Sequence, residues 1–303
     1  MKSATRFVVC LLLLFQSAAN LDEDMMELSL LSMDLCLAVE SQVLGDFADS
    51  STLYIDGSNA ALVYESNDYC FFVSDTTTRY DIQDWNKNLD LTVSSISYGT
   101  DAGESCRVRN GYRRAYQEPS YRGALEQEIR DCHSRGKQVV VTGHSMGGAV
   151  ASVAAIPLHD VNPMIITFGQ PPAIVGDCPV IDADKYFRFE NTKLNQGLSL
   201  HIDYDPVPQF RAQANQIGSI FILGEDTNNV VGYGDGTSPS IIKYGLDVDA
   251  HFSAAYRARL VSYQGKSIGT DGWNTGFRCN LNEECKSGKC NGGWWFGTSG
   301  RCT

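Results

Sequence analysis

The chain has 303 residues, with 24 Lys and Arg against 36 Asp and Glu, and its formal net charge is −12. That length allows one large α/β domain, or one domain plus a small module. The acidic charge argues against nucleic acid as a partner, because binding to phosphate backbones needs clustered basic residues. It also disfavours anionic lipid, which leaves uncharged esters, glycans and neutral lipid surfaces as partners.

The first nineteen residues are typical of a secretory signal peptide. Lys2 and Arg6 precede an apolar run at residues 7–15, which is too short to span a bilayer. Small residues then favour cleavage after Ala19. The alternative is a buried N-terminal strand. No later segment is apolar for eighteen residues, so we expect no transmembrane segment. The protein is therefore predicted to be secreted, or to stay in the lumen of the secretory pathway.

Residues 20–264 show the alternation of helix and strand patterns that is typical of one α/β domain. The hydrophobic periodicities predict helices at 24–45, 113–134, 149–158 and 251–264, and strands at 52–55, 60–64, 69–73, 138–142, 164–168, 186–190 and 198–204. Such alternation predicts a mostly parallel central sheet with helices on both faces.

The composition changes after residue 264. Residues 265–278 are Gly-rich and are predicted to form a linker. Residues 279–303 contain four Cys but are too few for a hydrophobic core, so we expect a small module held by two disulfides. Its Trp294 and Trp295 could contact glycan or a lipid interface, or simply fill the module.

Cysteine usage agrees with export from the cell. Removal of the signal peptide takes Cys10 and leaves nine cysteines, an odd number that predicts one free thiol or one intermolecular bond. The spacing of Cys and His matches no zinc pattern, and neither a metal nor a cofactor is predicted.

The most informative motif is Gly-His-Ser-Met-Gly-Gly at residues 143–148, directly after one predicted strand and before a predicted helix. Glycines two residues before and after Ser145 leave room for a very tight turn, which exposes the serine hydroxyl at the end of the sheet. The N–H of Met146 and the helix N-terminus then point to where an oxyanion would form. The alternative is an ordinary Gly-rich turn.

A nucleophilic serine needs a base and an acid, which in such folds follow it in the order acid, then His. His251 is the only histidine late enough in the chain, and the adjoining His144 is expected to point away from the serine hydroxyl. Asp205 follows an apolar stretch and begins the Pro-stiffened Asp-Pro-Val-Pro, so it is the first candidate for the acid. Asp203 is the reserve candidate. Taken singly, His251 could be a surface histidine and Asp205 a turn residue.

Several segments together resemble the class 3 lipases, the fungal-type α/β-hydrolases that include Rhizomucor-like triacylglycerol lipases and feruloyl esterases. Gly-His-Ser-Met-Gly-Gly resembles the nucleophile turn of that family, and Phe-Gly-Gln-Pro at 168–171 the turn after its next strand. Residues 205–208 resemble its acid loop, Val-Arg-Asn-Gly-Tyr at 108–112 its Val-His-x-Gly-Phe segment, and His251 with Tyr256 its histidine helix. The resemblance implies an α/β-hydrolase fold with Ser145 as nucleophile, Asp205 as acid and His251 as base.

The sequence departs from the family pattern in two places. Where the family has Arg-Gly-Thr or Arg-Gly-Ser, this chain has Val-Ser-Asp-Thr at 73–76, so Ser74 and Asp75 take the expected oxyanion position. A carboxylate there would oppose catalysis unless it points elsewhere. Residues 191–204 also look like an insertion before the acid.

The segment at 76–91 resembles the family's lid region. Ile82, Trp85 and Leu89 share one helical face, as they would in an amphipathic lid or in a plain surface helix docked on the core.

The sequence as a whole predicts a secreted serine ester hydrolase that cleaves lipid esters at a lipid–water interface through an acyl-enzyme. A feruloyl-type or other small-ester esterase is the alternative enzyme. A catalytically weak, hydrolase-like protein that binds glycan or lipid is the alternative outside the enzymes.

Overall fold

The computed structural model describes most of the chain between residues 23 and 263 and three short strands near the C-terminus. The described residues are 23–57, 59–76, 90–99, 104–195, 201–204, 217–223, 231–233, 245–246, 251–263, 278–279, 290–291 and 300–302. The predicted signal peptide, nearly all of the predicted linker and most of the Cys-rich segment lie outside these residues, so the domain boundaries stay predictions.

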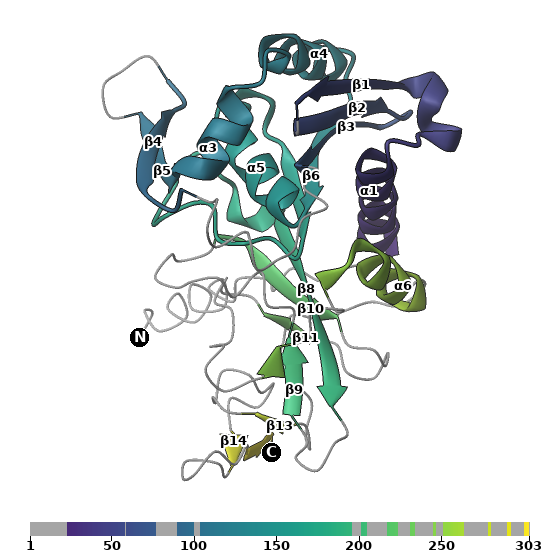
Figure 1. Cartoon of the computed structure of the whole chain (residues 1–303), viewed down its shortest axis with the longest axis vertical. Helices are drawn as coiled ribbons and strands as arrows, with labels where there is room; N and C mark the ends of the chain where they lie inside the picture. The colour runs from purple at the N-terminus through teal and green to yellow at the C-terminus, as the bar shows by residue number, and fades with distance from the viewer. Residues whose placement is uncertain are drawn as a thin grey trace, which may run out of the picture.

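A large sheet organises the molecule (Figure 1). Its order is β1-β2-β3-β6-β7-β8-β10-β11, with β9 beside β8 and β12 beside β9. The strands are β1 (Ser51–Asp56), β2 (Asn59–Glu65), β3 (Tyr69–Thr76), β6 (Gln138–His144), β7 (Met164–Phe168), β8 (Tyr186–Asn195), β9 (His201–Tyr204), β10 (Ser219–Leu223), β11 (Val231–Tyr233) and β12 (Gly245–Leu246). β3, β6, β7, β8 and β10 run parallel, which confirms the predicted mostly parallel centre. The edge pairs β1–β2, β2–β3 and β10–β11 are antiparallel.

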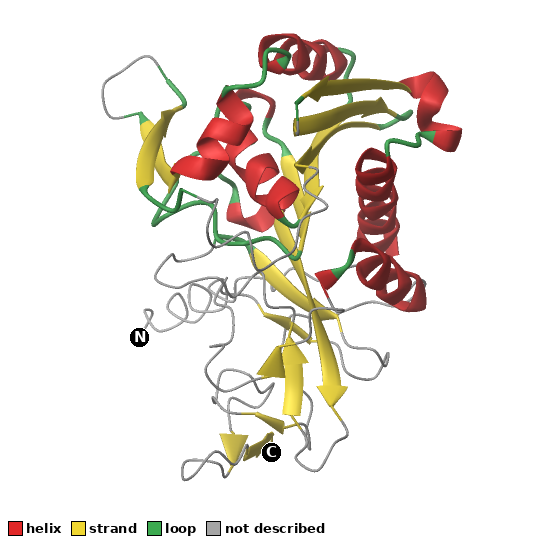
Figure 2. Ribbon diagram, viewed as in Figure 1, coloured by secondary structure: helices red, strands yellow, loops and turns green. Residues whose placement is uncertain are grey.

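Helices cover both faces of this sheet, as predicted (Figure 2). One face carries α3 (Asn110–Gln117), α4 (Arg122–Ser134) and α5 (Met146–Ala154), and the other carries α1 (Glu23–Ser41) and α6 (Ser253–Tyr263). Short 3-10 helices lie at η1 (Gly45–Ser50), η2 (His159–Val161) and η3 (Ala183–Lys185).

Strand β6 shows why a continuous apolar run forms a central strand. Val139 and Val141 face the cluster under α3, α4 and α5, whereas Val140 faces the cluster under α1 and α6. All three side chains are completely buried. A strand with a hydrophobic layer on both sides needs apolar residues at every position, and the sequence supplies them.

The long helix predicted at 113–134 is two helices. α3 ends at Gln117 and α4 begins at Arg122, with Pro119 between them. Proline has no N–H to donate, so the ladder of helical hydrogen bonds cannot continue through Pro119 and the first helix ends before it. The hydrophobic spacing continues across the break, which is why periodicity alone suggested one helix.

The insertion noted at 191–204 is a hairpin. β8 extends to Asn195, and β9 returns antiparallel to it, so that Tyr204 pairs with Thr192. The hairpin therefore lengthens the chain and still brings it back beside β8.

A second hairpin, β4 (Val93–Ser97) with β5 (Ser105–Arg109), was not predicted. The disulfide Cys106–Cys178 joins it to the segment after β7, and Cys70–Cys132 joins the start of β3 to α4. Near the C-terminus, β13 (Arg278–Cys279), β15 (Gly300–Cys302) and β14 (Cys290–Asn291) form a three-stranded sheet in that order.

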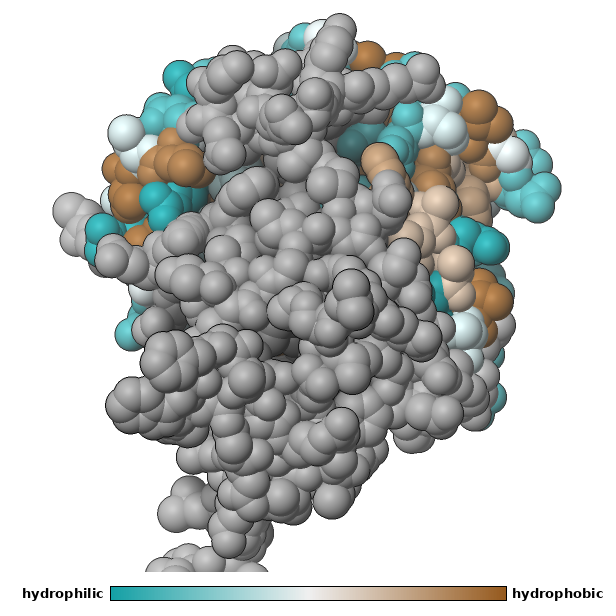
Figure 3. All heavy atoms as spheres, turned by 60° about the horizontal axis from the view of Figure 1, so that its bottom comes forward, coloured by the Kyte–Doolittle hydropathy of each residue, from teal (hydrophilic) through white to brown (hydrophobic). Residues whose placement is uncertain are grey.

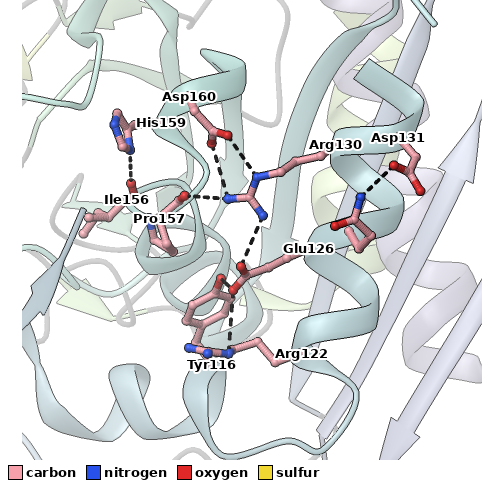
Figure 4. Close-up of polar contacts among 10 residues, drawn as sticks. Tyr116, Arg122, Glu126, Arg130, Asp131, Ile156, Pro157, His159 and Asp160 are labelled. Carbon is pink, nitrogen blue, oxygen red and sulfur yellow. Dashed lines mark hydrogen bonds and ion pairs between the residues drawn. The ribbon is translucent and has the colours of Figure 1, made fainter. Parts of the chain in front are cut away.

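Arg130 ties α4 to the chain that follows α5 (Figure 4). Its guanidinium donates to Asp160 Oδ2 at 2.9 Å and to the backbone oxygen of Pro157 at 3.0 Å, and it also contacts Glu126 on its own helix. These carboxylates, Asp160 first, raise the pKa of Arg130. The network holds α4 against the chain that follows the far end of α5, the helix that begins at Met146.

Candidate active site

Ser145 lies at a sharp turn between β6 and α5. Its backbone angles are φ 59° and ψ −129°, a region that residues other than glycine rarely adopt. The N–H of Ser145 donates to the backbone oxygen of Phe168 at 2.8 Å, which fixes the turn against β7. A strained serine on a strand–turn–helix is the geometry expected of a nucleophile turn.

Two glycines make this turn possible. A Cβ on Gly143 would lie 2.4 Å from the carbonyl carbon of Gly147, and a Cβ on Gly147 would lie 2.2 Å from the backbone oxygen of Ser74. Real Cβ atoms do not approach other atoms so closely, so neither position admits a side chain without movement. The predicted need for small residues on each side of Ser145 is confirmed.

His251 meets Ser145 across 106 residues of sequence. Its Nε2 lies 2.7 Å from Ser145 Oγ, and both side chains are buried, at 4% and 7% exposure. His251 lies two residues before α6, which packs through Tyr256 and Leu260 into the same core as α1. With its ring proton on Nδ1, the imidazole would accept the hydroxyl proton of Ser145 at this distance.

The segment at the end of β3 lies against the serine turn. Ser74 pairs in register with Gly143, and the Cα of Asp75 would lie 3.1 Å from a Cβ at Gly147. Met146 is the first residue of α5, so its N–H is one of the four at a helix start that have no partner within the helix. The structure thus brings the three candidate oxyanion residues Met146, Ser74 and Asp75 together around Ser145.

Asp75 also lines a small cavity on the α3 and α4 side, together with Tyr121 and Arg122. Burial raises the pKa of Tyr121 to about 12, and the negative charges of Asp56 and Asp75 add to the rise. A negative charge on Asp75 therefore acts on Tyr121 as well as on the serine turn.

Other candidates from the sequence lie outside the residues that the structure describes. These are Asp205, the three lid residues Ile82, Trp85 and Leu89, and Trp294 with Trp295. The backbone of the reserve acid Asp203 lies on β9, paired with Lys193 and Gly245. Their roles stay predictions.

No pattern in the sequence indicates the surroundings of the histidine. His144 contacts the backbone oxygen of His251, and Ser253 contacts both His144 and Glu40. The family resemblance was the only sign of Tyr256 in the sequence. The Tyr256 hydroxyl accepts a hydrogen bond from the N–H of Asn191 at 3.1 Å. Elements distant in sequence meet at all of these contacts, and hydrophobic spacing carries no information about them.

The part of the chain that the structure describes holds no group of three or more His, Cys, Asp and Glu residues that could bind a metal ion. In the same part, every helix is too short or too polar to cross a membrane.

The sheet, its two helical layers and the serine turn at the end of β6 define the chain as an α/β-hydrolase. Within that class, residues 72–213 match the family described as lipase (class 3). The resemblance found in the sequence is therefore confirmed, and the chain is a carboxylic ester hydrolase of the lipase type. No curated protein gives a significant match.

Solved structures of fungal lipases share the fold. Rhizomucor miehei lipase in complex with its propeptide is 19% identical with a TM-score of 0.53, and the match covers 82% of each chain. Mono- and diacylglycerol lipase from Aspergillus oryzae is 16% identical with a TM-score of 0.55, covering 77% of this chain and 98% of the other. A triacylglycerol lipase from Penicillium expansum is 14% identical with a TM-score of 0.54, covering 71% and 86%.

Proposed function

We propose that this protein hydrolyses carboxylic esters of neutral lipids through an acyl-enzyme on Ser145. The observation that carries the proposal is the 2.7 Å contact between Ser145 Oγ and His251 Nε2 on a strained strand–turn–helix. Asp205 is the proposed acid that orients His251, with Asp203 in reserve. The proposed oxyanion donors are the N–H of Met146 and a backbone N–H of the Ser74–Asp75 segment.

The reaction follows from the geometry of this pair. His251 Nε2 takes the hydroxyl proton while Ser145 Oγ bonds to the ester carbonyl carbon, and the carbonyl oxygen becomes the oxyanion. The ester C–O bond then breaks, and the leaving alcohol takes the proton from His251. Water attacks the acyl-enzyme with His251 again as base, which releases the carboxylic acid and restores Ser145.

Exposed apolar side chains beside α1 and α6 support a lipid substrate. Phe252 directly follows His251 and is 54% exposed, and Val43, three residues after Glu40 in sequence, is 67% exposed. Figure 3 shows hydrophobic residues on the described surface at the right of the view, the side on which Figure 1 has α1 and α6. The net charge of −12 favours neutral acylglycerols or galactolipids over anionic phospholipids, because like charges repel.

Two features support export. The sequence begins with the predicted signal peptide, and the described domain contains two disulfides, which form and persist in oxidising compartments. We therefore propose that the protein works outside the cell or in the lumen of the secretory pathway.

The test is labelling of the mature protein with a fluorophosphonate, followed by turnover of p-nitrophenyl esters of increasing chain length. We expect labelling of wild type, none of Ser145→Ala, and a rise in rate above the micelle concentration of long-chain esters. Equal labelling of wild type and Ser145→Ala, or none of either, contradicts the enzyme proposal. A preference for feruloyl or short esters with no rise at micelles would point to the esterase alternative.

A paired substitution identifies the acid. Asp205→Asn is expected to lower kcat about 10⁴-fold, because an amide no longer stabilises the imidazolium that forms at His251. Asp203→Asn is the matched control, and we expect it to change kcat less than tenfold. Circular dichroism of both variants shows whether they keep the fold. A larger loss of kcat in Asp203→Asn than in Asp205→Asn would make Asp203 the acid.

A further inference from the structure

His144 is the residue immediately before the proposed nucleophile, yet its ring contacts the histidine rather than the serine. The His144 and His251 ring centroids lie 4.8 Å apart, and His144 Nε2 lies 2.7 Å from the backbone oxygen of His251. A carbonyl oxygen can only accept a hydrogen bond, so Nε2 of His144 must carry the proton and donate. This contact fixes the orientation of the His144 ring.

The other ring nitrogen of His144 faces a second helix. Its Nδ1 lies 3.3 Å from Ser253 Oγ, and the Ser253 hydroxyl gives its single proton to Glu40 Oε2, so Nδ1 must be the donor in this contact and both ring nitrogens of His144 donate. Ser253 is 3% exposed at the start of α6, and Glu40 belongs to α1. A chain of polar contacts therefore runs from α1 through α6 and β6 to the backbone of His251.

The backbone at His251 lies next to the start of α6. Ala255 donates its N–H to the oxygen of Phe252 at 2.8 Å, which forms the first turn of α6. His251 thus lies just outside the helix, and its carbonyl oxygen is held by the side chain of His144. The position of that carbonyl sets how far the imidazole reaches toward Ser145.

We propose that His144 is a positioning residue for His251, and that Ser253 and Glu40 orient His144 for this task. The inference rests on the proposed catalytic role of the Ser145–His251 pair and adds how that pair is held. A displacement of about 1 Å in a catalytic group can lower the rate about a hundredfold. The hydrogen bond from His144 to the backbone oxygen of His251 acts on the distance between the His251 imidazole and Ser145 Oγ. His144 itself touches neither the substrate nor the reacting atoms.

The first test compares two substitutions at one position. His144→Ala is expected to lower kcat about 10- to 100-fold on a short soluble ester, with KM changed less than about threefold, because substrate contacts remain. His144→Gln can place an amide N–H near the lost Nε2–H and is expected to recover at least half of that loss on a logarithmic scale. The rate of fluorophosphonate labelling should follow kcat in both variants.

A double-mutant cycle tests whether Ser253 acts through His144. Ser253→Ala alone should lower kcat about 3- to 10-fold, and it should add nothing in the His144→Ala background, because residues in one network are not additive. Ser262→Ala is the matched control on the same helix, since Ser262 is exposed and its hydroxyl donates to the backbone oxygen of Arg259. We expect this control to keep the wild-type kcat.

Three results would overturn the proposal: wild-type kcat in His144→Ala, equal losses in His144→Gln and His144→Ala at equal Tm, or additive effects of His144→Ala and Ser253→Ala. If His144→Ala does not fold, the glutamine variant and Ser253→Ala carry the same test. Failure here is distinct from failure of the proposed function, because Ser145→Ala would still abolish labelling if only the positioning role were wrong.

Discussion

Ser145 adopts a backbone conformation that its neighbours impose. A residue in such a sparsely populated region costs of order 1–3 kcal/mol and persists only where the surroundings determine it. Here the bond from the Ser145 N–H to Phe168 and the close approach of Gly147 to Ser74 hold the turn. The strain places Oγ at the end of the sheet, where the imidazole of His251 reaches it.

At the same scale, Asp75 differs from the small polar residue that the family pattern has at this position. Its Cα would lie 3.1 Å from a Cβ at Gly147, so its backbone lies against the first turn of α5, and we expect a charge on its side chain to act on the proposed oxyanion. Repulsion between two such charges is worth roughly 1 kcal/mol or more in a partly exposed site.

We therefore expect Asp75→Asn to raise kcat about fivefold at neutral pH with little change in KM, because about 1 kcal/mol of repulsion is removed from the transition state. Steady-state kinetics on a soluble ester measures the change. Asp56→Asn is the control, since Asp56 also acts on Tyr121 but accepts from the N–H of Ser120 on the β1 side. A fall in kcat for Asp75→Asn would show that the carboxylate orders the oxyanion segment.

At the scale of elements, the close contact between β3 and α5 positions the site. The end of β3 touches the first turn of α5 through the backbones of Ser74 and Gly147, with no side chain between them. This contact brings the proposed oxyanion segment within reach of the serine. The Cys70–Cys132 disulfide links the other end of β3 to α4.

Gly147→Ala is expected to destabilise the fold by about 1–3 kcal/mol and to abolish most activity, because the added methyl must push β3 and α5 apart. Gly123→Ala is the matched control: it lies exposed in α4, a Cβ there meets nothing within 4 Å, and we expect it to be neutral or to stabilise by up to about 1 kcal/mol. Urea denaturation with activity assays measures both. Equal free energies of unfolding in the two variants would contradict the proposed contact.

At the scale of the whole molecule, the structure gives a reason for the odd number of cysteines expected in the mature chain. Cys70–Cys132 and Cys106–Cys178 are disulfides, and Cys36 is a free thiol on the buried face of α1. The four C-terminal cysteines remain to form the two predicted disulfides. Burial raises the pKa of the Cys36 thiol well above its ordinary value, so the reactive thiolate is scarce.

Thiol titration tests this assignment. The mature protein is expected to show no reactive thiol when native and one per chain in denaturant without reductant, because unfolding exposes Cys36 and breaks no disulfide. Cys36→Ala should show none in either condition. Three or more thiols in denatured wild type would mean that the C-terminal cysteines are not all paired, and a fast-reacting native thiol would contradict the burial of Cys36.

Sequence reasoning succeeded where the information is local. Val139, Val140 and Val141 indicated a strand buried on both faces, and the glycines around Ser145 indicated a tight turn, because each pattern reflects the chain's own backbone and nearest neighbours. It was wrong at Pro119, where apolar spacing continued across a break, and it missed the β4–β5 hairpin, whose strands are short and largely polar.

The sequence by itself determined the class of fold, and it predicted Ser145 as the nucleophile and, by elimination, His251 as the base. Only the tertiary structure decided that His251 comes within 2.7 Å of Ser145, that β3 closes on Gly147, and that Glu40, Ser253 and His144 meet behind the histidine. The reason is physical: turns and strands follow from interactions between near neighbours, whereas the meeting of α1, β6 and α6 follows from how their apolar faces pack into one core.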